Sequence, residues 1–168
     1  MNKKVRHMAH AAIIAAMYVG LTHLQNLILP GSATWAIQMR MSEALCVLAF
    51  FTPAAIPGLS IGCLLFNLTF AAALPLDFLV GTLATYLATQ AMFLLRGCRF
   101  RGIPVIGLLM PAVSNALLVG WELSVYIGGA FAMNALYVFL GEAIVLLIFG
   151  TALYFALRHR GLDRRLFS

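Results

Sequence analysis

Residues 41–73 read MSEALCVLAFFTPAAIPGLSIGCLLFNLTFAAA, and this stretch decides the fold because it can form one helix or two. It is almost wholly apolar, and Pro53 and Pro57 lie near its middle. Proline breaks or kinks a helix, since it lacks an amide hydrogen and clashes with the preceding turn. The stretch is therefore either a pair of helices, at about 41–51 and 54–73, or one long kinked helix.

The composition of the whole chain places this stretch in a membrane. Of its 168 residues, 63% are hydrophobic and only 10% are charged, whereas soluble domains carry about 25% charged residues. A helix that crosses a bilayer needs about 20 apolar residues. Further apolar runs cover about 8–29, 76–95, 105–127 and 130–157. The sequence predicts an all-α integral membrane protein with a single domain, residues 1–168.

The positions of the basic residues distinguish the two readings of 41–73. Ten of the eleven lysines and arginines lie before the first apolar run, between 96 and 101, or after the last run. Basic loops stay on the cytoplasmic side of a membrane, so an even number of crossings must separate these clusters. One helix over 41–73 gives three crossings before Arg96, and two helices give four. We therefore expect six transmembrane helices with both termini in the cytoplasm. Basic clusters between apolar runs also argue against binding of nucleic acid.

With this topology, the polar residues gather in the outer half of the membrane. Four of the five acidic residues lie there or near mid-membrane. An ionised carboxylate within a bilayer is costly and usually faces a cavity or a partner. The sequence therefore predicts a polar pocket that opens outward and closes at mid-membrane. Its floor would be Asn115 and Glu142, its walls and rim Glu122, Asp77 and Arg40, and its neighbours Glu43, Asn67 and Asn134.

Several of these residues could instead serve simpler structural roles. Arg40 and Glu43 are three apart, so they could form only a local ion pair at the headgroups. Asp77 suits the start of a helix, where the dipole favours an acid. Asn67 could serve only to join two helices. Glu122 and Glu142, on the fifth and sixth helices, have no lysine or arginine close in sequence. A role in ligand binding is therefore the stronger interpretation for both.

Small residues recur at helical spacing along one side of the first helix. They are Ala9, Ala12, Ala16 and Gly20, and Ala11 and Ala15 widen the strip. Such a strip lets another helix approach closely, so it serves either packing within the chain or docking of a partner. Gly58 and Gly62 form a second such pair on the third helix.

Motifs that carry chemistry are missing from the sequence. It has no GxxxxGK[ST] phosphate loop, no HExxH zinc motif and no CxxC pair. It also shows no inverted repeat of the kind that many secondary transporters have. We expect a protein that is not an enzyme and that uses no metal and no cofactor. A small bundle with a polar pocket and no energy source suggests a subunit that captures a substrate and takes its energy from other proteins.

Four segments carry a resemblance to a known family. They are IQMRMSEALCVLAFFTPAAIPGLSIGCLLFNL at 37–68, LDFLVGTLAT at 76–85, SNALLVGWEL at 114–123 and LGEA at 140–143. Together they resemble the QueT family, the substrate-binding S components of energy-coupling-factor (ECF) transporters for queuosine precursors. The resemblance covers most of the chain. It implies a six-helix bundle in the bacterial plasma membrane, with an AxxxA surface, here Ala12 and Ala16, that docks a membrane coupling subunit driven by two ABC ATPases.

The resemblance also implies a ligand, a 7-deazaguanine base such as the 7-cyano or 7-aminomethyl form, or queuine. The edge of such a base offers N–H and NH₂ donors that one carboxylate can accept, and proteins read bases by such bonds and by stacking. Glu142 or Glu122 would accept from that edge, and Asn115 and Asn67 would take the carbonyl or a ring nitrogen. Arg40 and Glu43 would hold the outer loop over the pocket. Candidates for stacking are Trp121, Tyr126 and Tyr137, although Trp121 also fits an interfacial tryptophan.

Two other classes of protein remain as alternatives. In a stand-alone proton-coupled secondary transporter, Glu142 would be a proton relay near mid-membrane. In a structural or assembly protein of the membrane, the buried acids would only join helices. Transport driven by a pH gradient without an ATPase would identify the secondary transporter. A protein that responds to no ligand would be the structural one.

Overall fold

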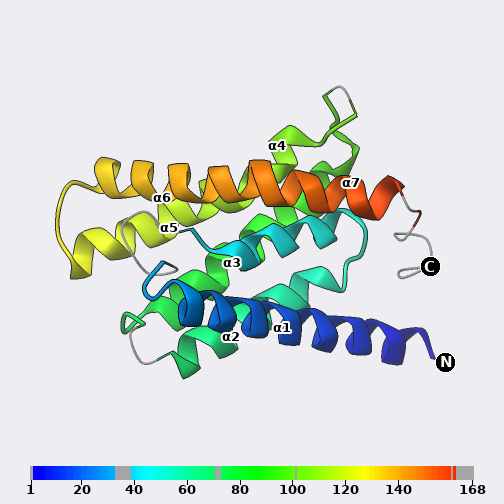
Figure 1. Cartoon of the computed structure of the whole chain (residues 1–168), viewed down its shortest axis with the longest axis horizontal. Coiled ribbons are helices and arrows are strands. Elements are labelled where there is room, and N and C mark those ends of the chain that lie inside the picture. The colour runs from blue at the N-terminus through cyan, green and yellow to red at the C-terminus, as the bar shows by residue number, and fades with distance from the viewer. Residues whose placement is uncertain (1, 33–38, 71–72, 101, 160, 162–168) are drawn as a thin grey trace.

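The computed structural model describes residues 2–32, 39–70, 73–100, 102–159 and 161, and these residues form a bundle of helices (Figure 1). An isolated antiparallel bridge, Phe100 to Ile103, is the only extended pairing in these ranges. The elements are α1 (Lys3–Ile28), η1 (Met41–Phe50), α2 (Ala55–Thr69), α3 (Asp77–Leu94), η2 (Leu95–Gly97), α4 (Val105–Leu108), α5 (Met110–Tyr126), α6 (Phe131–Val145), η3 (Leu146–Gly150) and α7 (Thr151–His159).

The helices overlap the six predicted segments, but α1 begins earlier, at Lys3, while η2 ends later, at Gly97, and α7 at His159. The stretch 41–73 is interrupted between η1 and α2. Four helical stretches are long and apolar enough to cross a membrane: Lys3–Ile28, Asp77–Gly97, Val105–Tyr126 and Phe131–His159. The other two apolar helices, Met41–Phe50 and Ala55–Thr69, are shorter. The all-helical fold is therefore confirmed, with four candidate membrane spans among the described residues, and six crossings stay a prediction.

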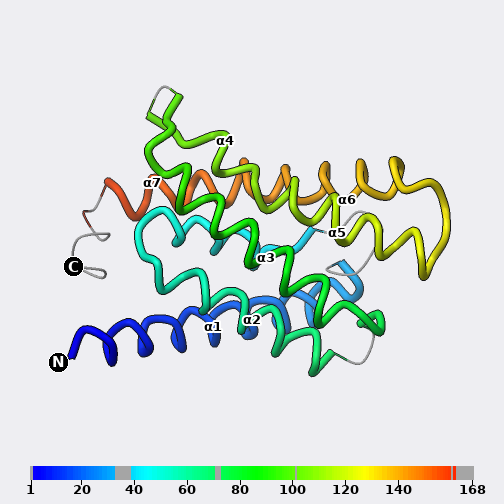
Figure 2. The backbone as a smooth tube through the Cα atoms, turned by 180° about the vertical axis from the view of Figure 1, so that it is seen from behind, coloured from blue at the N-terminus to red at the C-terminus, as the bar shows by residue number. Residues whose placement is uncertain are grey.

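The short helix η1 lies in the middle of the bundle. Figures 1 and 2 show α6 and α7 along one side of the molecule and α1 and α2 along the other, with η1, in cyan, between them. It packs against α1, α2, α3, α6, η3 and α7, and nine of its ten residues are buried. It is a 3₁₀ helix, so its ten residues extend about 20 Å, compared with about 15 Å for an α-helix.

Glycines let neighbouring helices approach closely at two contacts. A Cβ added to Gly58 would lie 2.7 Å from the carbonyl oxygen of Ala11, and one added to Gly62 would lie 2.8 Å from the Cβ of Tyr18. A Cβ added to Gly120 on α5 would lie 2.8 Å from the backbone of α6. The pair on α2 therefore serves internal packing against α1.

The small residues singled out on α1 divide between two sides, because Ala11 and Ala15 are buried against Gly58 and Gly62 of α2 and the others face away from α2. Ala9, Ala12, Ala16 and Gly20 are all exposed, and a Cβ added to Gly20 would meet no atom within 4 Å. The strip is thus part of the outer surface of the described bundle. The start of α1 and the end of α7 lie at the same end of the molecule (Figures 1 and 2).

Candidate functional site

Most of the polar residues predicted for the pocket are buried together inside the bundle. The carboxylates of Glu43, Glu122 and Glu142 are in residues with no exposed surface, and Asp77 is 4% exposed. Arg40 is 1% exposed and is the only basic residue of the chain outside the three terminal and loop clusters. Four acids and one guanidinium therefore share the interior, an excess of negative charge that a low-dielectric environment opposes.

Asn115 and Glu142, the predicted floor, contact each other directly. The Nδ2 of Asn115 on α5 donates to both carboxylate oxygens of Glu142 on α6, at 2.8 and 2.7 Å. The close approach of α5 and α6 at Gly120 allows this pairing. The Oδ1 of Asn115 is buried and accepts no hydrogen bond from the described residues.

Glu43 is held by two residues that the sequence analysis did not connect with it. Tyr18 on α1 donates its phenol hydrogen to Oε1 at 2.7 Å, and the thiol of Cys46 donates to Oε2 at 3.2 Å. Arg40 and Glu43 are both buried inside the bundle and not on its surface, and the ion pair between them at the headgroups stays a prediction. A clue was present in the sequence, because a tyrosine in an apolar helix usually needs a partner for its hydroxyl.

Asn67 connects α2 to the start of α3. Its Nδ2 donates to the backbone oxygen of Asp77 at 2.7 Å, while one oxygen of the Asp77 carboxylate accepts from the backbone N–H of Leu74 at 2.7 Å. Gly81 leaves room for this arrangement, since a Cβ there would lie 2.8 Å from the Asn67 amide nitrogen and 3.7 Å from a nitrogen of Arg40. The Arg40 guanidinium thus reaches from the start of η1 to α3.

Glu122 differs from the other acids because the neighbour within hydrogen-bonding range is itself an acid, the carboxyl group of Asp77. Neither of its oxygens accepts a hydrogen bond from an amide, hydroxyl or guanidinium group of the described residues. Its charged neighbours are Asp77 and Arg40. The adjacent α3 and α5 therefore bring the carboxyl groups of Asp77 and Glu122 within hydrogen-bonding range of each other, beside one guanidinium.

The aromatic residues predicted to stack on a ligand lie elsewhere. Trp121, Tyr126 and Tyr137 are exposed on the surface of the bundle. Asn134 is engaged at the α5–α6 connection, where its Nδ2 donates to Ser124 Oγ at 3.1 Å and to the Gly128 oxygen at 3.0 Å. The structure does not bring these four residues to the buried cluster, and their positions agree with interfacial and connecting roles.

The described residues contain no group of three or more His, Cys, Asp or Glu side chains that could hold a metal ion. A sequence profile of the QueT transporter family matches residues 8–159, which is most of the chain. No curated protein and no solved structure matches this sequence.

Proposed function

The chain belongs to the QueT transporter family of membrane transport proteins, and from that premise we propose that it is the substrate-capture S component of an ECF-type importer. Its substrate is a queuosine precursor, a 7-deazaguanine base. It has no ATPase of its own, and it takes its energy from a coupling subunit and two ABC ATPases. The protein resides in the bacterial plasma membrane.

One observation carries the substrate class: acceptor oxygens without an amide, hydroxyl or guanidinium donor gather in the buried cluster. They are both oxygens of Glu122 and the amide oxygens of Asn67 and Asn115. A buried acceptor without a hydrogen bond costs free energy that a bound ligand can recover. The ligand that fits is therefore rich in donors, and a 7-deazaguanine base supplies ring N–H and exocyclic NH₂ groups.

The charges of the cluster refine this choice. Asp77 and Glu122 lie beside each other with Arg40 as a charged neighbour, and the four buried acids share this one guanidinium among the buried residues that the structure describes. A ligand with an amine reduces that excess, whereas a nitrile offers only an acceptor. The site accordingly favours the 7-aminomethyl base or queuine over the 7-cyano base. Glu122 accepts from the ligand, and the Asn115–Glu142 pair forms the floor below it.

The exposed strip on α1 supports the assignment of a partner. Ala12 and Ala16 lie on the outer surface, while α2 packs on another side of α1 through Gly58 and Gly62. A strip of small residues lets a second helix approach closely. The coupling subunit docks here.

The proposed topology has six crossings and cytoplasmic termini. Basic residues mark the start of α1, the connection after α3 and the end of α7, and such clusters stay in the cytoplasm. The two short helices, η1 and α2, complete the even number of crossings. Because η1 is buried among other helices, its length need not match the thickness of the lipid.

Ligand-dependent stability of the purified chain in detergent tests the proposal. The 7-aminomethyl, 7-cyano and queuine bases are added separately, with guanine and riboflavin as controls. A ligand that binds only the folded state at a hundredfold excess over its Kd stabilises the protein by about 2.7 kcal/mol. The Glu122→Gln variant should lose most of this gain, and Trp121→Leu, at the exposed neighbouring position, should keep it.

Three outcomes contradict the proposal. If no deazaguanine stabilises well-folded protein, the substrate class is wrong. If Glu122→Gln responds as the wild type does, the site is wrong. Uptake by the chain alone in liposomes, driven by a pH gradient without an ATPase, would instead establish the proton-coupled secondary transporter.

A further inference from the structure

Gln25, close to the C-terminal end of α1, makes contacts that the proposed function does not use. Its side chain is buried, with the residue only 5% exposed. Its Nε2 donates to Ser32 Oγ at 2.9 Å and to the backbone oxygen of Met39, and its Oε1 accepts from the backbone N–H of Met41 at 2.8 Å. The amide nitrogen and the amide oxygen are therefore both engaged, and all three bonds go to the segment that leads from α1 to η1.

These bonds fix the backbone on both sides of Arg40. Met39 precedes Arg40, and Met41, the first residue of η1, follows it. The backbone N–H of Met39 also donates to the backbone oxygen of Ser32 at 3.0 Å. A chain that is bonded before and after a residue leaves the Cα of that residue little freedom. The starting point of the Arg40 side chain is therefore set from α1, by Gln25.

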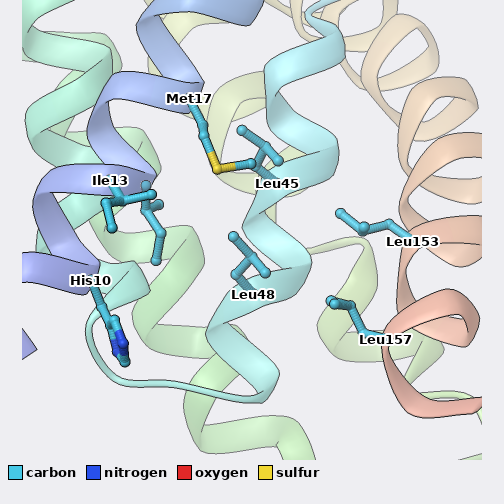
Figure 3. Close-up of a pocket in the computed structure, with 8 residues that line it drawn as sticks. His10, Ile13, Met17, Leu45, Leu48, Leu153 and Leu157 are labelled. Atoms are coloured by element: carbon cyan, nitrogen blue, oxygen red, sulfur yellow. The ribbon is translucent and has the colours of Figure 1, made fainter. Parts of the chain in front are cut away.

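The helix that carries Gln25 is itself held against η1. Tyr18, on the same buried side of α1, donates to Glu43 Oε1 at 2.7 Å. Figure 3 shows Met17 of α1 next to Leu45 of η1, where the two helices line one apolar groove. Gln25 thus extends from a well-anchored helix, and it can hold the residues before and after Arg40 in place.

The position of Arg40 matters because of the groups that its guanidinium faces. A Cβ added to Gly81 would lie 3.7 Å from one of its nitrogens, and Asp77 and Glu122 are among its charged neighbours. Glu122 accepts from the ligand in the proposed function, so the guanidinium also lies near the ligand. A fixed positive charge there repels an ammonium group on a ligand, and it has no such effect on a neutral ligand.

We propose that Gln25 is a positioning residue that sets the charge selectivity of the binding site through Arg40. The selectivity rests on the proposed function for its ligand, whereas the hold of Gln25 on Arg40 rests on the contacts alone. Without the Gln25 amide, the guanidinium is free to move away from the ligand. A shift from about 4 to about 6 Å weakens its repulsion of a ligand ammonium by an amount worth about tenfold in affinity.

Isothermal titration calorimetry of the purified chain tests this with two probes, the 7-aminomethyl base, whose amine is cationic at neutral pH, and the neutral 7-cyano base. Gln25→Leu and Gln25→Met keep the approximate size of the side chain and remove its amide. Each should raise the preference for the cationic base by about tenfold. Asn26→Leu is the matched control, because the Nδ2 of Asn26 donates to the Thr22 oxygen within α1, at 3.0 Å. It should keep the preference of the wild type.

The same substitutions in an Arg40→Lys background separate positioning from a general loosening of the fold. A lysine ammonium lies on a flexible stem, so its place depends less on the backbone, and Gln25→Leu should then change the preference less. A general loosening would instead weaken binding of both bases equally. An unchanged preference in both Gln25 variants overturns the proposal, and so does an equal change in the arginine and lysine backgrounds.

Thermal unfolding without ligand provides a second readout. Gln25→Leu should lower the Tm, because it leaves the Met39 oxygen and the Met41 N–H without their partner. Residues of one network are not additive, so this loss should be smaller when residue 40 is lysine. Equal losses in the two backgrounds would refute the hold on Arg40. If the losses differ but neither base binds the wild type, the proposed substrate is wrong and the hold of Gln25 on Arg40 is supported.

Discussion

Replacing Tyr18 with phenylalanine removes the phenol that donates a hydrogen bond to Glu43 and lies beside the thiol of Cys63, and it keeps the ring. The phenol donates to Glu43 Oε1 at 2.7 Å, and both residues have no exposed surface. Phenylalanine keeps the ring and leaves little cavity, so the loss is that of a hydrogen bond to a charged group, about 1.5–3 kcal/mol. Oε2 of Glu43 keeps the thiol of Cys46, and we therefore expect a loss of about 2 kcal/mol in the free energy of unfolding.

Equilibrium unfolding in mixed micelles measures this loss. Tyr86→Phe is the matched control, because Tyr86 is exposed and its hydroxyl only accepts from Gln90 at 3.0 Å. That variant should change stability by no more than about 0.5 kcal/mol. In a Glu43→Gln background, the cost of Tyr18→Phe should fall to about 1 kcal/mol, since the acceptor is then neutral. Equal stabilities of the Tyr18 and Tyr86 variants would refute the argument, as would an unchanged cost in the Glu43→Gln background.

Two further predictions concern helix packing and the floor of the site. Gly62→Ala should destabilise the protein by about 1–3 kcal/mol, because its new Cβ overpacks a tight contact, whereas Gly20→Ala, which meets no atom within 4 Å, should gain up to about 1 kcal/mol from helix propensity. Thermal unfolding of both checks the pair, and equal effects would contradict the packing argument. Asn115→Leu removes the hydrogens that both Glu142 oxygens accept, so it should cost about 1–3 kcal/mol or more in unfolding free energy. Glu142→Gln in the same protein should recover part of that loss, and no recovery would mean that the pair does not carry it.

The local pattern of the sequence was sufficient for the secondary structure. Apolar runs of adequate length gave the helical segments, and Pro53 and Pro57 indicated the interruption between η1 and α2. These features depend on neighbouring residues, because a proline breaks a helix wherever it folds. The 3₁₀ form of η1 was not predictable in this way, since its close packing among several other helices is a property of the whole bundle.

The sequence also identified the buried acids, because a carboxylate in an apolar run is costly unless it faces a cavity or a partner. The sequence could not show which of these acids accept hydrogen bonds from other side chains. Tyr18 is 25 positions from Glu43, and Asn115 is 27 from Glu142, so only the packing of helices shows that these acids have donors and that Glu122 has no amide, hydroxyl or guanidinium donor among the described residues.

By itself, the sequence determined a helical membrane protein with a polar interior, a strip of small residues on α1 and a second pair of glycines on α2. Only the tertiary structure decided that Gly58 and Gly62 face α1 while Ala12 and Ala16 face outward. Only it decided which acceptors of the described residues lack a hydrogen. The physical reason is the same in both cases: spacing along a helix specifies a face, and the partner of that face comes from a helix that is distant in the sequence.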